Sequence, residues 1–185
     1  PPSPRDEIGP GADPAEIAAV ICGAHAQVLS AAELSIALRI EGATRATVRR
    51  ALWDEHRLIK TYGPRGTVHL LAFGDLPMWT AALSAVPAHS PFPDGVRLTS
   101  EQAEQVVAAI GDALEDGELI IDELDRAVVQ RVGTWAGERV MPAFQELWPR
   151  WRQALGTAGH RGLLCFGRNR GRRVTYTNPR RWFHG

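Results

Sequence analysis

The sequence has few cysteines, a single lysine and no long apolar run. Its two cysteines, Cys22 and Cys165, are too few for a metal cluster and do not form a Cys-x-x-Cys pair, so we expect free thiols in a reducing compartment. No apolar stretch approaches the roughly 20 residues that a membrane-spanning helix needs, and no secretory signal opens the chain. We therefore expect a cytoplasmic protein with no membrane contact, no metal and no cofactor.

The net charge is zero, but the charges are segregated along the chain. Residues 101–125 hold nine acidic residues and no basic one, whereas residues 160–185 hold seven arginines and no acid. Lys60 is the single lysine, so nearly all of the positive charge is guanidinium, which suits bidentate phosphate contacts. Local patches of charge, more than the total, determine affinity for nucleic acid. The acidic segment alternatively suits docking to another protein.

Residues 44–71 predict a helix followed by a β-hairpin. Thr44 has the side chain of a helix cap, and short strands rich in β-branched and aromatic residues are expected over 58–62 and 67–72. Between them, Gly63-Pro64-Arg65-Gly66 has the chemistry of a tight turn. A helix with a hairpin behind it is the recognition helix and wing of a winged helix-turn-helix domain, an architecture that usually contacts DNA.

Two shorter helices are predicted ahead of this stretch. The first spans residues 14–22 and starts with an Asp-Pro-x-Glu capping sequence at Asp13. The second spans residues 31–40 and has Leu34, Ala37 and Leu38 on its apolar face. Together with the helix that follows Thr44, they would complete a three-helix domain.

The second half of the chain repeats this order. A capping box, Thr99-Ser100-Glu101-Gln102, opens one helix, a second follows Asp122, and a third is expected over 142–155. Strands at 163–166 and 174–177 then form another hairpin, whose loop is rich in arginine and glycine. The two halves share little sequence identity, but their predicted helices and strands follow the same order, which indicates an internal repeat.

The predicted fold is therefore α+β and mainly helical. It consists of two tandem winged helix-turn-helix domains, each with three helices and a β-hairpin wing. The expected boundaries are 12–90 for the first domain, 91–98 for a linker and 99–185 for the second domain. Residues 1–11, rich in proline and glycine, are expected to form a disordered lead-in.

Basic side chains cluster on the elements that would contact DNA. The candidates on the third helix and the two wings are Arg45, Arg49, Arg50, Arg65, His69, Arg168, Arg170, Arg172 and Arg173. Arginines on a helix face or a hairpin tip suit groove and phosphate contacts. Other assignments stay open: a solvated arginine face with Trp53 in the core, a second hairpin that is only a solvated basic loop, and a pairing of His69 with a strand neighbour.

The two hairpin sequences, residues 57–70 and 161–175, together resemble a known family. They are similar to the bacterial winged-helix DNA glycosylases of the AlkZ and YcaQ type, and the likeness runs from about residue 14 to the end. Members of that family have tandem winged helices followed by a β-barrel domain, so the resemblance implies an N-terminal fragment. It also implies excision of alkylated bases and unhooking of interstrand crosslinks.

The resemblance assigns a catalytic motif to His25-Ala26-Gln27. The family has Gln-x-Gln or Gln-x-Asp just after the first helix, so Gln27 matches the second position and His25 departs from the first. A glutamine amide orients water, and a histidine can orient water and also accept a proton near neutral pH. Because residues i and i+2 diverge by about 200° on a helix, the motif requires residues 24–28 to be extended or irregular.

Two functions follow as hypotheses. The first is a DNA glycosylase that acts, as a monomer, on double-stranded DNA carrying alkylated or crosslinked bases. The alternative is a non-catalytic winged-helix DNA-binding protein, such as a transcription regulator. Both predict DNA affinity that falls steeply with salt.

Overall fold

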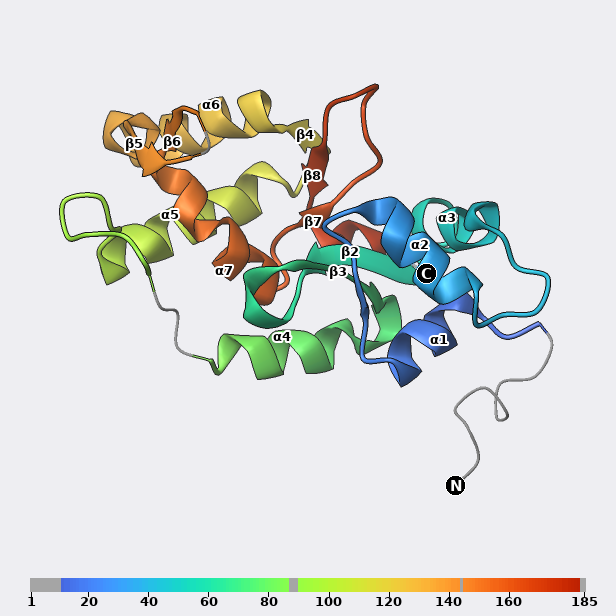
Figure 1. The fold of residues 1–185 in the computed structure, drawn as a ribbon. Coiled ribbons are helices and arrows are strands. Elements are labelled where there is room, and N and C mark those ends of the chain that lie inside the picture. The colour runs from blue at the N-terminus through green and yellow to red at the C-terminus, as the bar shows by residue number, and fades with distance from the viewer. Residues whose placement is uncertain (1–10, 87–89, 144, 184–185) are drawn as a thin grey trace. The chain divides into compact units, whose positions relative to one another are not determined.

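The computed structural model describes residues 11–86, 90–143 and 145–183 as a mixed α/β protein. Within these ranges it contains seven α-helices and three small antiparallel sheets. The chain divides into two compact units, one up to Trp79 and the other from Thr80 (Figure 1). The expected lead-in, 1–11, lies almost entirely outside the described residues, and the expected domain boundaries at 90 and 99 stay predictions.

The first unit follows the predicted order of three helices and a hairpin, with one extra strand. Its elements are α1 (Pro14–Val20), β1 (Ala24–His25), α2 (Leu29–Ala37), α3 (Arg45–Trp53), β2 (Leu58–Tyr62) and β3 (Val68–Ala72), and it also holds the start of α4 (Leu76–Ser84). The Asp13 carboxylate accepts the Ala15 N–H at 2.8 Å, and the Glu16 carboxylate accepts the Asp13 N–H at 3.2 Å. Local capping chemistry thus fixes where α1 begins, as predicted.

β3 is the central strand of the first unit's sheet, whose order is β1-β3-β2. His69 of β3 lies opposite His25 of β1 on one side and Thr61 of β2 on the other. The fully buried apolar side chains of this unit come from its helices and its sheet, and include Ile17, Ile36, Val48, Leu52, Leu58 and Leu70. Figure 1 shows α1, α2 and α3 grouped around the sheet.

The apolar face predicted for α2 was right for Ala37, which is buried, and wrong for its two leucines. Leu34 and Leu38 are exposed, whereas the buried stripe contains Ala32, Glu33 and Ile36. Two sets of α2 residues have the spacing of a single helix face. The set that packs into the core is the one that contains the Glu33 carboxylate. A buried carboxylate is tolerated only when it is paired, and Glu33 is paired with two arginines of α3.

The second unit has the same strand order as the first. Its elements are α5 (Ser100–Ala113), β4 (Leu119–Ile120), α6 (Ile121–Val132), β5 (Arg139–Pro142), β6 (Leu147–Pro149), α7 (Leu155–His160), β7 (Cys165–Phe166) and β8 (Thr175–Thr177). The order β4-β8-β7 repeats β1-β3-β2, because in each unit the strand before the second helix pairs with the last strand. The internal repeat expected from the sequence therefore appears in the strand order.

The predicted helix over 142–155 was also wrong. Its first part forms the β5-β6 hairpin, in which Arg139 pairs with Pro149, and the rest forms a 3₁₀ helix, η4 (Arg150–Ala154), followed by α7. A proline inside an α-helix removes a hydrogen bond and clashes with the preceding turn, so Pro149 ends the hairpin instead. Trp151 is fully buried, and its Nε1–H donates to Asp125 at 2.6 Å.

Candidate active site and nucleic-acid interface

The motif His25-Ala26-Gln27 lies on an extended segment at the edge of the first unit's sheet. Ala24 and Ala26 are buried, whereas His25 and Gln27 are exposed. The Ala26 N–H donates to the Val68 carbonyl at 2.7 Å, so the segment continues the pairing of β1 beyond His25. Alternation in an extended strand places residues i and i+2 on one side. Both candidate side chains therefore face solvent from the same side, as the extended arrangement predicts.

A sharp turn delivers the chain from α1 into this segment. Cys22 and Gly23 both have positive φ, 55° and 94°. A Cβ atom at Gly23 would lie 2.6 Å from Cδ2 of Leu71 and 3.3 Å from the carbonyl oxygen of Leu70. Only glycine satisfies both the backbone angle and the close approach, and this approach brings β1 against β3.

His69 supports His25 from the central strand. The two rings meet edge to face, with centroids 5.5 Å apart and planes at 83°. His69 Nδ1 lies 3.0 Å from the Thr67 carbonyl oxygen; because a carbonyl only accepts, Nδ1 carries the proton and Nε2 faces the other way. A Cβ atom at Gly63 would lie 2.7 Å from Nδ1, so the absence of a side chain there makes room for the ring. The pairing of His69 with a strand neighbour, left open by the sequence, is thus found.

Arg65 is at the tip of the β2-β3 hairpin, as predicted. It has a left-handed backbone, with φ of 61°, within the short η1 turn (Pro64–Gly66). Its side chain is exposed and makes no hydrogen bond or ion pair with any described residue. The guanidinium therefore keeps all five of its N–H donors for solvent or a ligand.

The α3 arginines are held by acids of the same unit. Arg45 Nε donates to Glu33 Oε2 at 2.7 Å, and Arg49 Nε donates to Glu33 Oε1 at 2.6 Å. Glu33 is fully buried, and this pairing raises the pKa of Arg49, mainly through the hydrogen bond with Glu33. Arg50 pairs with the exposed Glu55 at 2.8 Å. All three predicted contacts thus carry a partly compensated charge.

The arginine-rich hairpin of the second unit is also compensated from within. Arg170 donates to the Glu123 carboxylate at 2.9 Å and to the Glu118 carbonyl at 2.9 Å. Arg173 pairs with Asp122. Arg168 is exposed, and its carbonyl accepts the Thr175 hydroxyl.

Arg172 differs from these neighbours. It is exposed and makes no ion pair or hydrogen bond with a described residue. Elsewhere in the unit, Arg161 forms a bidentate pair with Glu104, at 2.5 and 2.6 Å. The acidic and basic segments of the sequence therefore meet in the fold, which leaves both the acidic docking surface and the basic wing weaker than the sequence alone indicates.

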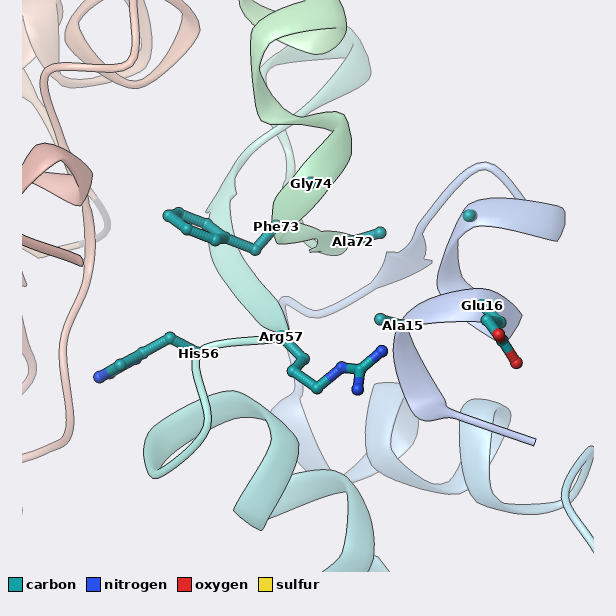
Figure 2. A pocket seen from close by; sticks show the side chains of 8 residues that line it. Ala15, Glu16, His56, Arg57, Ala72, Phe73 and Gly74 are labelled. Carbon is teal, nitrogen blue, oxygen red and sulfur yellow. The ribbon is translucent and has the colours of Figure 1, made fainter. Parts of the chain in front are cut away.

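The first unit also has an open, largely apolar hollow of about 400 Å³, away from the motif. It lies between the start of α1 and the turn after β3, and Figure 2 shows Phe73 and His56 on one side of it and Ala15 on the other. Arg57, which also lines it, pairs with Asp13. Ala72 borders the hollow, whereas His25 pairs with His69 three residues earlier on β3, so the hollow and the motif occupy different ends of that strand.

Within the described ranges, no three histidine, cysteine or acidic side chains are placed to hold a metal ion. No described helix is long and apolar enough to cross a membrane.

Sequence reasoning missed the acids that organise the site. Glu33 reaches Arg45 and Arg49 from 12 and 16 residues away, and Glu123 reaches Arg170 from 47 residues away. One signal was available for Glu33: it lies beside Ala32 and three residues from Ile36 on a helix. A carboxylate at a position of helical apolar spacing requires a cationic partner.

Comparisons with known proteins agree with the resemblance found in the sequence. A family model described as DNA glycosylase AlkZ-like matches residues 19–184. A curated relative from Streptomyces sahachiroi, an interstrand DNA cross-link repair glycosylase, is 30% identical over 174 residues, which cover 86% of this chain and 42% of the relative. The solved structure of Streptomyces sahachiroi DNA glycosylase AlkZ matches with a TM-score of 0.78 and 27% identity, over 97% of this chain and 47% of that one.

The chain thus spans less than half the length of these two relatives. Because the family model covers residues 19–184, nearly the whole chain takes part in the match. The chain belongs to the DNA glycosylase AlkZ-like family.

Proposed function

We propose that this chain forms two tandem winged helices of a DNA repair glycosylase. Each unit has helices followed by a hairpin, and the strand before the second helix closes the sheet in both, β1-β3-β2 and β4-β8-β7. Three antiparallel strands with the hairpin as the wing suit the winged helix-turn-helix architecture and its contacts with double-stranded DNA. The relative's printed name, an interstrand DNA cross-link repair glycosylase, supports alkylated or crosslinked bases as the substrate class.

The proposed reaction is hydrolysis of an N-glycosidic bond. A water oxygen bonds to the sugar carbon, the bond to the base breaks, and its electron pair leaves with the base. An alkylated purine is cationic, so it departs without a strong general acid. The Gln27 amide orients the water, and His25 orients it and accepts its proton as the bond forms.

One observation carries this proposal: His25 and Gln27 are exposed on the same side of an extended segment, between buried alanines. The His69 ring contacts the His25 ring, and the turn of the same hairpin carries Arg65. The proposed DNA contacts are Arg45, Arg49, Arg50, Arg65, His69, Arg168, Arg170, Arg172 and Arg173, and all eight of these arginines are exposed. Such a protein would act on DNA as a monomer in the cytoplasm.

The test uses the protein at its full natural length and a duplex that carries one N7-alkylated purine. Alkali cleavage of abasic sites should show product with the wild type and a loss of at least about 100-fold in rate with Q27A, since positioning of the reacting water contributes several orders of magnitude. The matched control is S30A, because Ser30 is a nearby exposed residue of α2 that is outside the motif.

A non-catalytic DNA-binding protein is the second candidate. It is favoured by His25, which departs from the family glutamine, and by the hollow, which lies at the other end of β3 from the motif. Tight, salt-sensitive binding to the alkylated duplex without abasic product would select this candidate and reject the glycosylase.

A further inference from the structure

The contact between Glu33 and α3 has a geometry that an ordinary neutralising ion pair does not require. Each carboxylate oxygen accepts one Nε–H: Oε2 from Arg45 at 2.7 Å and Oε1 from Arg49 at 2.6 Å. Glu33 is completely buried, whereas the two arginine side chains are 53% and 52% exposed. One buried acid on α2 therefore fixes two half-exposed guanidinium groups one helical turn apart.

The remaining N–H donors of these two arginines have no partner among the described residues. Arg45 and Arg49 donate only through Nε to any described residue, so each keeps four N–H bonds on its two terminal nitrogens. Those nitrogens form the edge of the guanidinium that matches two oxygens of a phosphate. The cluster keeps a net charge of +1, because one carboxylate meets two guanidinium groups.

We propose that Glu33 is a positioning residue that presets Arg45 and Arg49 as a pair of ligands for the phosphodiester backbone of DNA. This inference rests on the proposed DNA binding of the first unit. Free arginine side chains lose rotamer freedom when they bind, and a side chain that is already held loses less. A ligand group that is fixed by a buried partner also stays closer to the productive geometry.

The proposal makes a prediction opposite in sign to that of simple electrostatics. Removal of an acid next to arginines makes a protein more positive, which ordinarily strengthens binding to DNA. If Glu33 presets the arginines, E33Q weakens binding although the net charge rises by one. Glu55 provides the matched control, since it also pairs with an α3 arginine, Arg50, but is exposed; E55Q should bind with equal or higher affinity.

Fluorescence anisotropy with a short labelled, undamaged duplex measures this difference, with the full chain and at several salt concentrations. We expect E33Q to lose roughly fivefold to tenfold in affinity, the cost of ordering two long side chains. The slope of log affinity against log salt should stay near that of the wild type, because the same phosphates are contacted. Collapse of the α2–α3 packing would instead lower the affinity and the slope together, and would overturn the proposal.

A second variant, R45K/R49K, tests the positioning role of Glu33 even if E33Q does not fold normally. R45K/R49K conserves every charge and still neutralises Glu33, but an ammonium cannot hold Glu33 through one edge and phosphate through another. We expect the same fivefold to tenfold loss, with an unchanged circular dichroism spectrum. Wild-type affinity in R45K/R49K, or stronger binding in E33Q, would refute the positioning role and leave the proposed function standing. No binding by the wild type at low salt would overturn both.

Discussion

The imidazole rings of His25 and His69 meet edge to face, with their centroids 5.5 Å apart and their planes at 83°. His25 is on the short edge strand β1, and His69 is directly opposite it on the central strand β3. The His69 ring is itself held by Thr67 and fits against Gly63. The orientation of His25 thus depends on a residue of the hairpin, His69, that lies 44 positions later in the sequence.

Replacement of His25 by glutamine tests what this residue contributes to the proposed excision. H25Q gives the motif both family glutamines, and an amide in place of the ring can still orient water. We therefore expect the excision rate at neutral pH to stay within about tenfold of the wild type. An imidazole can also accept the proton of the water and an amide cannot, so the H25Q rate should be the lower of the two.

The measurement is the single-turnover excision rate at neutral pH on a duplex with an N7-alkylated purine. Single turnover separates the chemical step from product release. Equal rates for the wild type and H25Q would show that His25 does not accept a proton in the reaction.

Substitution of Gly63 by alanine tests the support behind this pair. The backbone at Gly63 is in the extended region, with φ of −116°, so any residue can adopt it. The new Cβ atom, however, would lie 2.7 Å from Nδ1 and 2.9 Å from Cγ of His69. We expect G63A to displace the ring and to lower the free energy of unfolding by roughly 1–3 kcal/mol, the usual cost of an overpacked site.

Urea unfolding of G63A and of G74A measures this cost. A Cβ atom at Gly74 would meet nothing within 4 Å, so the control should stay within about 0.5 kcal/mol of the wild type, as surface substitutions usually do. Equal destabilisation of the two variants would show that the space at Gly63 is not needed for His69.

Features that depend on a few adjacent residues were predictable from the sequence. The starts of α1, α3 and α5 follow from the caps Asp13, Thr44 and Thr99, and each of these side chains accepts the expected backbone N–H. The β2-β3 hairpin follows from the Gly-Pro-Arg-Gly turn at 63–66. Helix capping and turn formation involve only three or four adjacent residues, so they can be predicted without knowledge of the fold.

Features that depend on residues far apart in the chain were not predictable from the sequence. Glu33 clamps two arginines of the next helix, and Asp122 and Glu123 take up Arg173 and Arg170 of the second hairpin. The sequence shows opposite charges in separate segments, but it does not show which carboxylate the fold brings to which guanidinium. The ion-pair partner of each arginine was therefore not predictable from the sequence.

Acid pH should weaken the second unit through Glu104. Hydrogen bonds from Arg161 hold the pKa of Glu104 below its ordinary value of 4.5. A carboxylate with a lowered pKa in the folded state stabilises the fold above its unfolded pKa, and this contribution is lost as the pH falls through the folded value. We expect E104Q to be slightly less stable than the wild type at neutral pH, by less than about 1 kcal/mol for such an exposed pair, and the two proteins to converge well below pH 4.5.

Thermal unfolding across the acid range measures this convergence. The control is E115Q, because Glu115 is exposed and makes no side-chain hydrogen bond or ion pair with a described residue. E115Q should follow the wild-type curve at every pH. A constant difference between E104Q and the wild type, without convergence in acid, would mean that the pair with Arg161 is not the source of the stability.

Arginines of the second hairpin should contribute differently to DNA binding, because some are already paired with a carboxylate and others are not. Arg172 has no partner among the described residues, so R172A should lower affinity severalfold and reduce the slope of log affinity against log salt by about one, as expected for one lost phosphate contact. Arg173 already pairs with Asp122, so its transfer to a phosphate would require that pair to break. R173A should therefore change affinity less than R172A, although both variants lose one positive charge from the same loop. Anisotropy titrations of the two variants against one undamaged duplex compare them directly. An equal loss of affinity would show that the ion pairs between this loop and α6 break when DNA binds. The whole loop would then act as a single basic patch.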